Sequence, residues 1–436
     1  MSLDPVELKA VIQEQEAQRK AFLGGGGIVE REAAGGGAKK ALAAPNILAV
    51  TGPRRCGKSV LTWLLARGQK SGCINFDDER LRGARSGDLN TILRVLYEVQ
   101  GSGLECIVLD EVQNVAGWEL FASRLRSTKK VLVTGSNSRL LSGELATHLT
   151  GRHLDLVLFP YSFREYVKSE VSPGPKPGDY TTAAAAQAQS LLSRYLLEGG
   201  FPEVKKLGTG MLRQLFSDIV TNDVVRRHTI RVPSDLYGLA RHLLTSTAKE
   251  VSFSRLRPVV GGRKLDTVKR YVGYLSDAYL IFMLERFSYK LREQALAPKK
   301  VYCIDQGLAR AVSFRTGEDE GRMMETVVAV EMNRLVRTLG SDLEVYYWKD
   351  HQQHEVDFVL KAGKDVVQLV QVCADVREPD VRKRELRAIL KASRELRCKK
   401  LLILTRDHEE DLKVEGRMVR FLPLWRWLLE RSLTTK

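Results

Sequence analysis

Short apolar runs alternate with amphipathic stretches between residues 46 and 158. We expect strands in the apolar runs, which are residues 46–51, 73–76, 106–109, 130–134 and 154–158. We expect helices in the stretches between several of them, at residues 58–67, 89–99 and 118–127. Strands that alternate with helices indicate an α/β domain with a parallel sheet. The uninterrupted apolar run 106–109 is typical of a strand in the middle of such a sheet.

The segment before these strands has a different pattern. Residues 5–22 are expected to form a polar helix with a thin apolar stripe made of Leu8, Val11 and Ile12. Two glycine clusters follow, at 24–27 and 35–37, and glycine in this density interrupts regular structure. We therefore expect this segment to be flexible or to form an oligomer contact.

The second half of the chain changes character three times. Residues 170–189 contain SPGPKPGDY and then an alanine-rich stretch, which indicates a linker or an insertion. Helices dominate residues 191–247, and a different pattern covers residues 251–287. Strands and helices alternate again from residue 299, which predicts a second α/β domain.

The turn after the first strand carries a phosphate-binding motif. Residues 52–59, GPRRCGKS, fit GxxxxGK[ST] and lie between an expected strand and an expected helix. Backbone N–H groups of such a turn surround the β-phosphate, and the helix adds the positive end of its dipole. We expect Lys58 to contact the β- and γ-phosphates and the Ser59 hydroxyl to ligate Mg²⁺, so the predicted cofactors are ATP and Mg²⁺. The residues expected to bind nucleotide are Gly52, Pro53, Arg54, Arg55, Cys56, Gly57, Lys58, Ser59 and Val60.

Two carboxylates follow the central apolar strand. In CIVLDE, four apolar residues are followed by Asp110 and Glu111. We expect Asp110 to bind magnesium through water and Glu111 to polarise the attacking water. The alternative is a strand that ends in acidic surface residues, and the nearby phosphate motif favours the catalytic interpretation.

Small polar residues follow the next strand, VLVTGSN. In a sheet of this order, Ser136 or Asn137 would lie beside the phosphate loop and contact the γ-phosphate or the attacking water. A turn that caps the following helix explains the same residues equally well.

Several motifs together resemble a known family. GPRRCGKS, DEVQ, TGSNSRLL, LTGR, FPYSFREY, YLLEGGFPEV, DIVTNDVVRRH and EVDFVL are similar to motifs of archaeal and bacterial AAA-type ATPases with a C-terminal domain of unknown function 4143. The resemblance implies an oligomeric ATPase with an AAA-like core, a helical lid, a winged helix and a nuclease-like domain. It makes Arg152 a candidate sensor or arginine finger. The alternative for Arg152 is a structural salt bridge at a strand edge.

These features give an expected fold class and domain organisation. The fold is α/β, a P-loop AAA-like parallel sheet followed by further modules. The expected parts are an N-terminal helix and flexible segment (1–45), the ATPase core (46–170), a linker (171–189), a helical lid (190–247), a winged helix (248–292) and a nuclease-like α/β domain (293–436).

The expected winged helix has a basic face. Residues 252–256 and 264–277 are expected helices separated by a glycine turn, and the apolar residues 278–287 are an expected strand. Residues expected to contact DNA phosphates are Arg255, Arg257, Arg263, Lys264, Lys269 and Arg270. A packing module with a solvated basic face is the alternative.

The nuclease-like domain has an incomplete motif. Domains of the PD-(D/E)xK type arrange a helical Glu, a strand Asp and a strand Glu-x-Lys around a metal ion. Glu325 and Asp357 fit the first two positions, but Gln371 and Cys373 stand where Glu and Lys are required. We expect a degenerate site rather than an active nuclease. Residues 381–400 form an expected basic helix that either lines a nucleic-acid groove or is a solvated face.

Composition adds two constraints. The 436 residues carry a formal net charge of +16, which favours polyanionic partners such as DNA over a merely soluble basic surface. Six scattered cysteines form no CxxC pair, and neither a signal peptide nor an apolar membrane span is apparent, so we expect a cytoplasmic protein without membrane contact. The predicted function is a DNA-associated ATPase whose cycle moves the later domains. The alternatives are an ATP-switched nuclease and a signalling or scaffold ATPase without nucleic acid.

Overall fold

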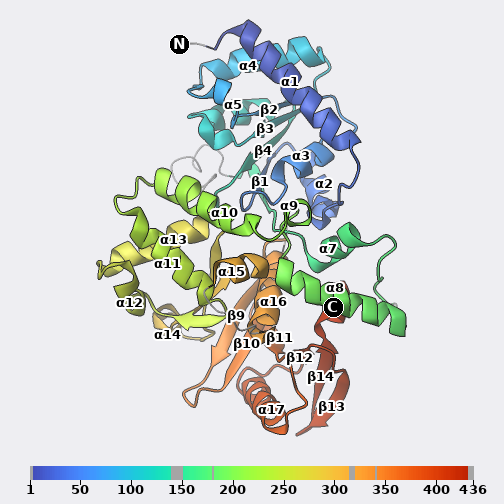
Figure 1. Cartoon of the computed structure of the whole chain (residues 1–436), viewed down its shortest axis with the longest axis vertical. Coiled ribbons are helices and arrows are strands. Elements are labelled where there is room, and N and C mark those ends of the chain that lie inside the picture. Colours follow the sequence, from blue (N-terminus) through green and yellow to red (C-terminus); the bar gives the residue numbers. More distant parts are fainter. Residues whose placement is uncertain (1–2, 139–150, 179–180, 314–319, 339–340, 431–436) are drawn as a thin grey trace. The chain divides into compact units, whose positions relative to one another are not determined.

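The computed structural model describes residues 3–138, 151–178, 181–313, 320–338 and 341–430. It divides into two compact units (Figure 1). The first comprises Met1–Phe159 with Asp277–Tyr279 and Arg337–Gly340, and the second comprises Pro160–Ser276, Leu280–Val336 and Ser341–Lys436. We describe each unit by itself.

The first unit contains a five-stranded parallel sheet in the order β2-β3-β4-β1-β5. Its strands are β1 (Ile47–Thr51), β2 (Ser71–Asn75), β3 (Cys106–Asp110), β4 (Lys130–Gly135) and β5 (His153–Val157). All five expected strands and the three expected helices are present, and the predicted α/β fold class is confirmed. The helices are α3 (Lys58–Leu65), α4 (Asp88–Gln100) and α5 (Trp118–Leu125).

Alternate residues of the strands supply two cores on opposite faces of this sheet. Ile47 and Ala49 pack in one core with residues of α1 (Pro5–Gly24), α4 and α5. Leu48 and Val50 pack in the other core with residues of α2 (Gly36–Ala43) and α3. Figure 1 shows α1 and α4 lying along each other at this end of the chain. The period of two along β1 therefore places helices on both faces, as in other parallel sheets.

The N-terminal segment is more closely packed than the sequence indicated. The expected helix is present as α1 (Pro5–Gly24), and its apolar stripe Leu8, Val11 and Ile12 is buried in the core of the first unit. The second glycine cluster does not interrupt regular structure, because α2 (Gly36–Ala43) begins within it. Burial of Ala38, Ala41 and Leu42 against the sheet stabilises this short helix despite its glycines.

The second unit begins with helices. They are α7 (Phe163–Glu170), α8 (Thr182–Glu198), α9 (Val204–Leu207), α10 (Met211–Asp218), a π-helical turn (Ile219–Arg226) and α11 (Pro233–Thr245). The expected linker at 171–189 is partly wrong, because its alanine-rich part lies inside α8. Thr181 caps this helix by accepting a hydrogen bond from Ala184 N, and alanine has the highest helix propensity.

A three-stranded antiparallel sheet follows in the order β6-β8-β7. The strands β6 (Lys249–Val251), β7 (Ile281–Leu284) and β8 (Lys299–Cys303) are accompanied by α12 (Phe253–Leu256), α13 (Leu265–Asp277) and α14 (Leu291–Leu296). Strand β8 lies entirely after residue 292, where this module was expected to end.

The C-terminal part contains a six-stranded mixed sheet in the order β13-β14-β12-β11-β10-β9. Its strands are β9 (Leu343–Lys349), β10 (Glu355–Ala362), β11 (Asp365–Val372), β12 (Leu401–Thr405), β13 (Glu410–Val414) and β14 (Arg417–Pro423). Its helices are α15 (Gln306–Val312), α16 (Glu320–Val336), α17 (Pro379–Glu395) and α18 (Leu424–Glu430). The expected second α/β domain is therefore present.

Candidate active site

The turn between β1 and α3 has the backbone conformation of a phosphate-binding loop. Gly52 has a φ of 146°, and a Cβ at this residue would lie 2.1 Å from the carbonyl oxygen of Leu158. Gly57 is left-handed with a φ of 95° and precedes the first residue of α3. Both glycines are thus required by the path of the chain and not only by the motif.

Lys58 folds back over this loop. Its side chain is buried, and the ammonium Nζ lies 3.0 Å from the oxygen of Pro53 and 3.3 Å from that of Gly52. The same nitrogen is 3.8 Å from Glu111 Oε1. The structure therefore brings together the loop lysine and one of the two acidic residues expected at the site.

Asp110 lies between two hydroxyl groups. Its buried carboxylate is hydrogen-bonded to Ser59 and accepts a hydrogen bond from Thr134. Burial raises the pKa of Asp110, while the bonds to Ser59 and Thr134 act in the opposite direction. A carboxylate beside a serine hydroxyl provides hard oxygen ligands, so Ser59 and Asp110 fit a magnesium ion that takes its other ligands from phosphate and water.

Glu111 is positioned by three neighbours. Its backbone is left-handed, with a φ of 51°, and its N–H donates to Thr134 Oγ1 over 2.9 Å. Gln113 Nε2 donates to Glu111 Oε2 over 2.5 Å, and Lys58 lies on the side of Oε1. Thr134 thus contacts both acidic residues. This role was not predicted, although Thr134 is the polar residue that interrupts the apolar run of β4 beside Asp110.

Ser136 and Asn137 follow β4 at the same edge of the sheet. Both are buried, and Gly135 at the end of β4 pairs in register with Thr51, which precedes the loop. The parallel register therefore places them beside Gly52. Their contact with a γ-phosphate or water stays a prediction.

A second residue that the sequence did not indicate is Arg31. Its buried guanidinium donates to the oxygen of Cys56 over 2.8 Å and to that of Phe159 over 2.6 Å. It therefore joins the phosphate loop to the chain that leaves β5. Burial of Cys56 raises the pKa of its thiol, whereas the positive charges of Lys58 and Arg31 act in the opposite direction.

Helix α1 also borders the site. A pocket of about 270 Å³ is lined by Asp110 together with Gln15, Arg19 and Phe22 of α1 and Trp63 of α3. The helix that was expected to be flexible therefore forms a wall next to the acidic strand end.

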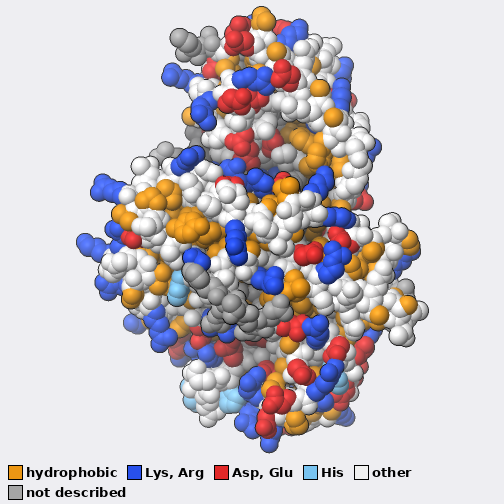
Figure 2. All heavy atoms as spheres, in the orientation of Figure 1, with side chains coloured by type: hydrophobic (Ala, Val, Ile, Leu, Met, Phe, Trp, Pro, Cys, Tyr) orange, Lys and Arg blue, Asp and Glu red, His pale blue; other side chains and the backbone are white. Residues whose placement is uncertain are grey.

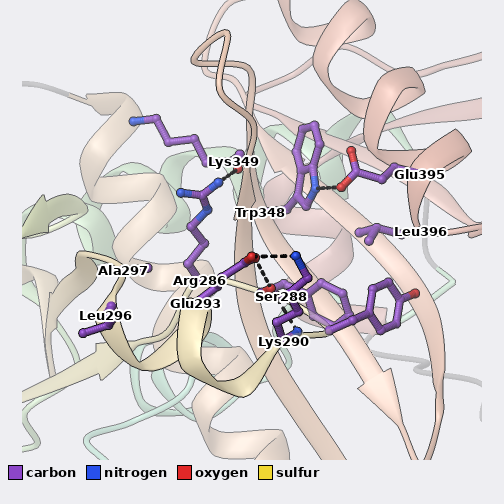
Figure 3. A pocket seen from close by; sticks show the side chains of 12 residues that line it. Arg286, Ser288, Lys290, Glu293, Leu296, Ala297, Trp348, Lys349, Glu395 and Leu396 are labelled. Atoms are coloured by element: carbon purple, nitrogen blue, oxygen red, sulfur yellow. Dashed lines mark hydrogen bonds and ion pairs between the residues drawn. The ribbon is translucent and has the colours of Figure 1, made fainter.

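A larger pocket, of about 640 Å³, lies in the second unit between the β7–β8 connection and the residues Trp348 and Glu395 (Figure 3). Its polar groups contact each other. Lys290 pairs with Glu293 at 2.9 Å, Arg286 donates to the carbonyl oxygen of Lys349, and Trp348 Nε1 donates to Glu395 over 3.2 Å. The phosphate loop is therefore the stronger candidate for an anionic ligand.

Comparison with known proteins agrees with this geometry. An AAA domain matches residues 44–167, and the domain of unknown function DUF4143 matches residues 320–427. A further domain of unknown function, DUF8612, matches residues 189–319. The uncharacterised protein MJ1544 of Methanocaldococcus jannaschii is 30% identical over 88% of this chain and 89% of its own length. The chain belongs to the AAA-type P-loop ATPase family with a C-terminal DUF4143 domain.

Other members and neighbours are more distant. An uncharacterised protein of Haemophilus influenzae is 26% identical over 76% of this chain and 83% of its own length. The Walker-type ATPase PABY2304 of Pyrococcus abyssi is 13% identical, with a TM-score of 0.40, over 65% of this chain and 96% of its own. No helix among the described residues is long and apolar enough to cross a bilayer.

Arg152 does not lie at the phosphate loop of its own chain. It precedes β5, and its oxygen accepts a hydrogen bond from Ile47 N at the start of β1, whereas the loop follows the end of β1. Its guanidinium Nη1 lies 3.4 Å from Ser123 Oγ. The structure thus places Arg152 at the end of the parallel strands opposite to the phosphate loop. A role of Arg152 at the nucleotide of a neighbouring chain stays a prediction.

The three residues of the expected nuclease-like site do come together. Lys300 Nζ lies 2.9 Å from both Glu325 Oε1 and Asp357 Oδ1. Gln371 Oε1 accepts a hydrogen bond from Asp357 N over 3.1 Å, and Gln371 Nε2 donates to Glu385 over 2.7 Å. Lys300 was not among the predicted residues, because it lies on β8, outside the motif.

Proposed function

We propose that this protein binds ATP with Mg²⁺ and hydrolyses it. The observation that carries the proposal is the contact between the loop and the acidic strand end, where Ser59 meets Asp110 and Lys58 meets Glu111. Two hard oxygen ligands, a buried lysine and a second carboxylate are the groups that phosphoryl transfer to water requires.

Each group has a distinct role in this proposal. Lys58 exchanges the carbonyl oxygens of Gly52 and Pro53 for phosphate oxygens, which are stronger partners for an ammonium group. Ser59 and Asp110 bind the magnesium ion, which neutralises phosphate charge. Glu111 orients the attacking water and accepts its proton, while Gln113 fixes its carboxylate.

Two substitutions separate binding from hydrolysis. Lys58→Ala is expected to abolish nucleotide binding, and Glu111→Gln to retain binding but lower kcat by about 100-fold or more, as expected for loss of a general base. Exposed residues of the same unit provide matched controls, namely Lys39→Ala and Glu105→Gln. A Glu111→Gln chain that hydrolyses ATP at the parent rate would refute the assignment of Glu111.

We also propose that the ATPase associates with DNA through α12 and α13. Helix α11, strand β6, helices α12 and α13 and strands β7 and β8 come in the order of a winged helix, with α14 inserted between β7 and β8, and this order supports the interpretation. Of the expected phosphate contacts, Arg255, Arg257, Lys264, Lys269 and Arg270 are exposed, and Arg263 is half-buried. Figure 2 shows Lys and Arg side chains along the margin that carries these helices in Figure 1.

Two of the expected contacts are already engaged within the module. Arg263 pairs with Asp235 at 2.5 Å, and Arg257 Nε donates to the oxygen of Arg263 over 3.0 Å. We therefore assign DNA contact to the other four basic residues and a structural role to these two. Duplex DNA binding at low salt tests the proposal, and the absence of binding would favour a scaffold ATPase without nucleic acid.

A further inference from the structure

A buried lysine lies at the centre of the nuclease-like site. Lys300 is on β8, the middle strand of the β6-β8-β7 sheet, and it is 2% exposed. Its Nζ lies 2.9 Å from Glu325 Oε1, 2.9 Å from Asp357 Oδ1 and 2.6 Å from Glu355 Oε1. An ammonium group has three hydrogens, so three carboxylates saturate it.

The carboxylates come from α16 and β10, two of the three elements that carry metal ligands in this class of nuclease. Glu325 is on α16 and Asp357 is on β10, and a divalent cation shared by them would lie between their facing oxygens. Lys300 Nζ lies in this space, at 2.9 Å from both residues. The ammonium group of Lys300 and a metal ion are both positively charged and would occupy the same space. The presence of the ammonium group therefore excludes the metal ion, both sterically and by charge repulsion.

Several other oxygen contacts of the site are also made within the protein. Asp357 Oδ2 accepts a hydrogen bond from Val372 N over 3.0 Å, and Tyr302 donates to Glu325 Oε1 over 2.7 Å. Glu355 Oε2 pairs with Lys349 at 3.2 Å. The groups that would have to turn toward a metal are therefore bonded within the protein.

The charge of Lys300 is maintained by this arrangement. Burial alone lowers the pKa of a lysine, but the facing carboxylates Asp357 and Glu325 outweigh burial and hold the pKa of Lys300 well above its usual range. Lys300 is thus a permanent cation, held on β8 and surrounded by groups from α16 and β10.

We propose that Lys300 is a built-in replacement for the divalent metal, so that the nuclease-like centre binds no metal and instead fastens the three-stranded sheet to the six-stranded sheet. The Gln371 and Cys373 substitutions agree with this role. Gln371 uses its amide to bridge Asp357 N and Glu385, which a metal-binding glutamate would not do. In this proposal, the ionic cluster around Lys300 stabilises the contact between the two sheets and does not cleave nucleic acid.

The test is a Mn²⁺ titration of the full chain, with Asp110→Asn as background to remove the metal site of the phosphate loop. The background protein is expected to bind no Mn²⁺ at the cluster. Lys300→Met, which keeps the length of the side chain without its charge, is expected to create one new Mn²⁺ site by uncovering the carboxylates. Adding Asp357→Asn to this variant is expected to abolish the gain.

Two outcomes would overturn the proposal. One is a Mn²⁺ site in the background protein that disappears on Glu325→Gln, because the lysine would then not exclude the metal. The other is a folded Lys300→Met chain without a new Mn²⁺ site. If Lys300→Met does not fold in EDTA, we expect folding to be recovered in Mn²⁺ but not when Asp357→Asn is also present. If Mn²⁺ did not restore folding of Lys300→Met, the proposal that Lys300 replaces the metal would also be wrong.

Discussion

At the scale of single residues, Thr134 is the group on which the acidic half of the site depends. Its hydroxyl donates to Asp110 and accepts from Glu111 N, so one side chain fixes both carboxylates. We predict that Thr134→Val, which keeps the shape, lowers kcat by about 10- to 100-fold, as for other residues that orient ligands. Thr134→Ser keeps the hydroxyl and should retain activity. Steady-state ATPase assays measure both, and equal rates for Val and wild type would contradict the role.

The residues that the sequence predicted and those it missed differ in a physical way. Lys58, Ser59, Asp110 and Glu111 are recognisable because their chemistry follows directly from a local pattern of strand, turn and helix. Arg31 is not, because its partners Cys56 and Phe159 are 25 and 128 residues away and are backbone oxygens. Because any residue has a backbone oxygen, the identity of the acceptor residue does not indicate such a contact in the sequence. Only the folded structure reveals it.

At the scale of elements, helix α1 shows how a correct pattern led to a wrong conclusion. The stripe of Leu8, Val11 and Ile12 was recognised, but the adjacent glycine clusters led to the expectation of a flexible segment or an oligomer contact. Its partners are α4 and β2, which begin more than 60 residues later. Local periodicity identifies an apolar face, but only the tertiary fold identifies the surface that covers it.

This packing gives a prediction with a matched control on one helix. Ile12 is 1% exposed and Val6 is 77% exposed, and both are β-branched. Ile12→Ala should lower the free energy of unfolding by about 2–5 kcal/mol because it leaves a cavity. Val6→Ala should change it by less than about 0.5 kcal/mol. Urea unfolding measures both, and similar effects at the two sites would show that α1 is not part of the core.

A second element-scale prediction concerns the start of α15. Asp305 caps this helix by accepting from Leu308 N over 2.8 Å, and it also accepts from Gly200 N over 2.7 Å. Complete burial raises its pKa from 3.8 to about 6, with the backbone N–H groups opposing the shift. A raised pKa in an acid means that the folded state binds the proton more tightly, so this group favours folding less as pH rises from about 4 to 6.

The magnitude follows from linkage. The unfolding free energy of the wild type, relative to that of Asp305→Asn, should fall by about 2 kcal/mol between pH 4 and pH 7, because the unfolded chain is already partly ionised at pH 4. The asparagine retains an acceptor for the helix start but does not titrate in this range. Chemical unfolding of both chains at the two pH values measures the difference. A difference that is constant with pH would show that Asp305 has an ordinary pKa.

At the scale of the whole molecule, the question is whether the net charge of +16 acts globally or through a defined surface. A diffuse basic surface and the α13 face make the same prediction for overall DNA affinity, because both release counterions. They differ when charge is removed at one place. Lys269 and Arg270 are exposed on α13, whereas Lys383 and Arg387 are exposed on the basic helix α17, so the two pairs allow a comparison at equal net charge.

We predict that Lys269→Gln with Arg270→Gln reduces the slope of log Kobs against log salt concentration by about 1.8, which corresponds to two lost phosphate contacts. Lys383→Gln with Arg387→Gln should leave the slope unchanged if α17 is a solvated face. Fluorescence anisotropy with a short duplex at several salt concentrations measures both.

An equal loss of slope in the two variants would mean that the net positive charge of the whole protein determines DNA affinity. The α13 face would then have no special part in DNA binding. Loss only with the α17 pair would instead assign the groove to the C-terminal domain, the alternative that the basic sequence at residues 381–400 had left open.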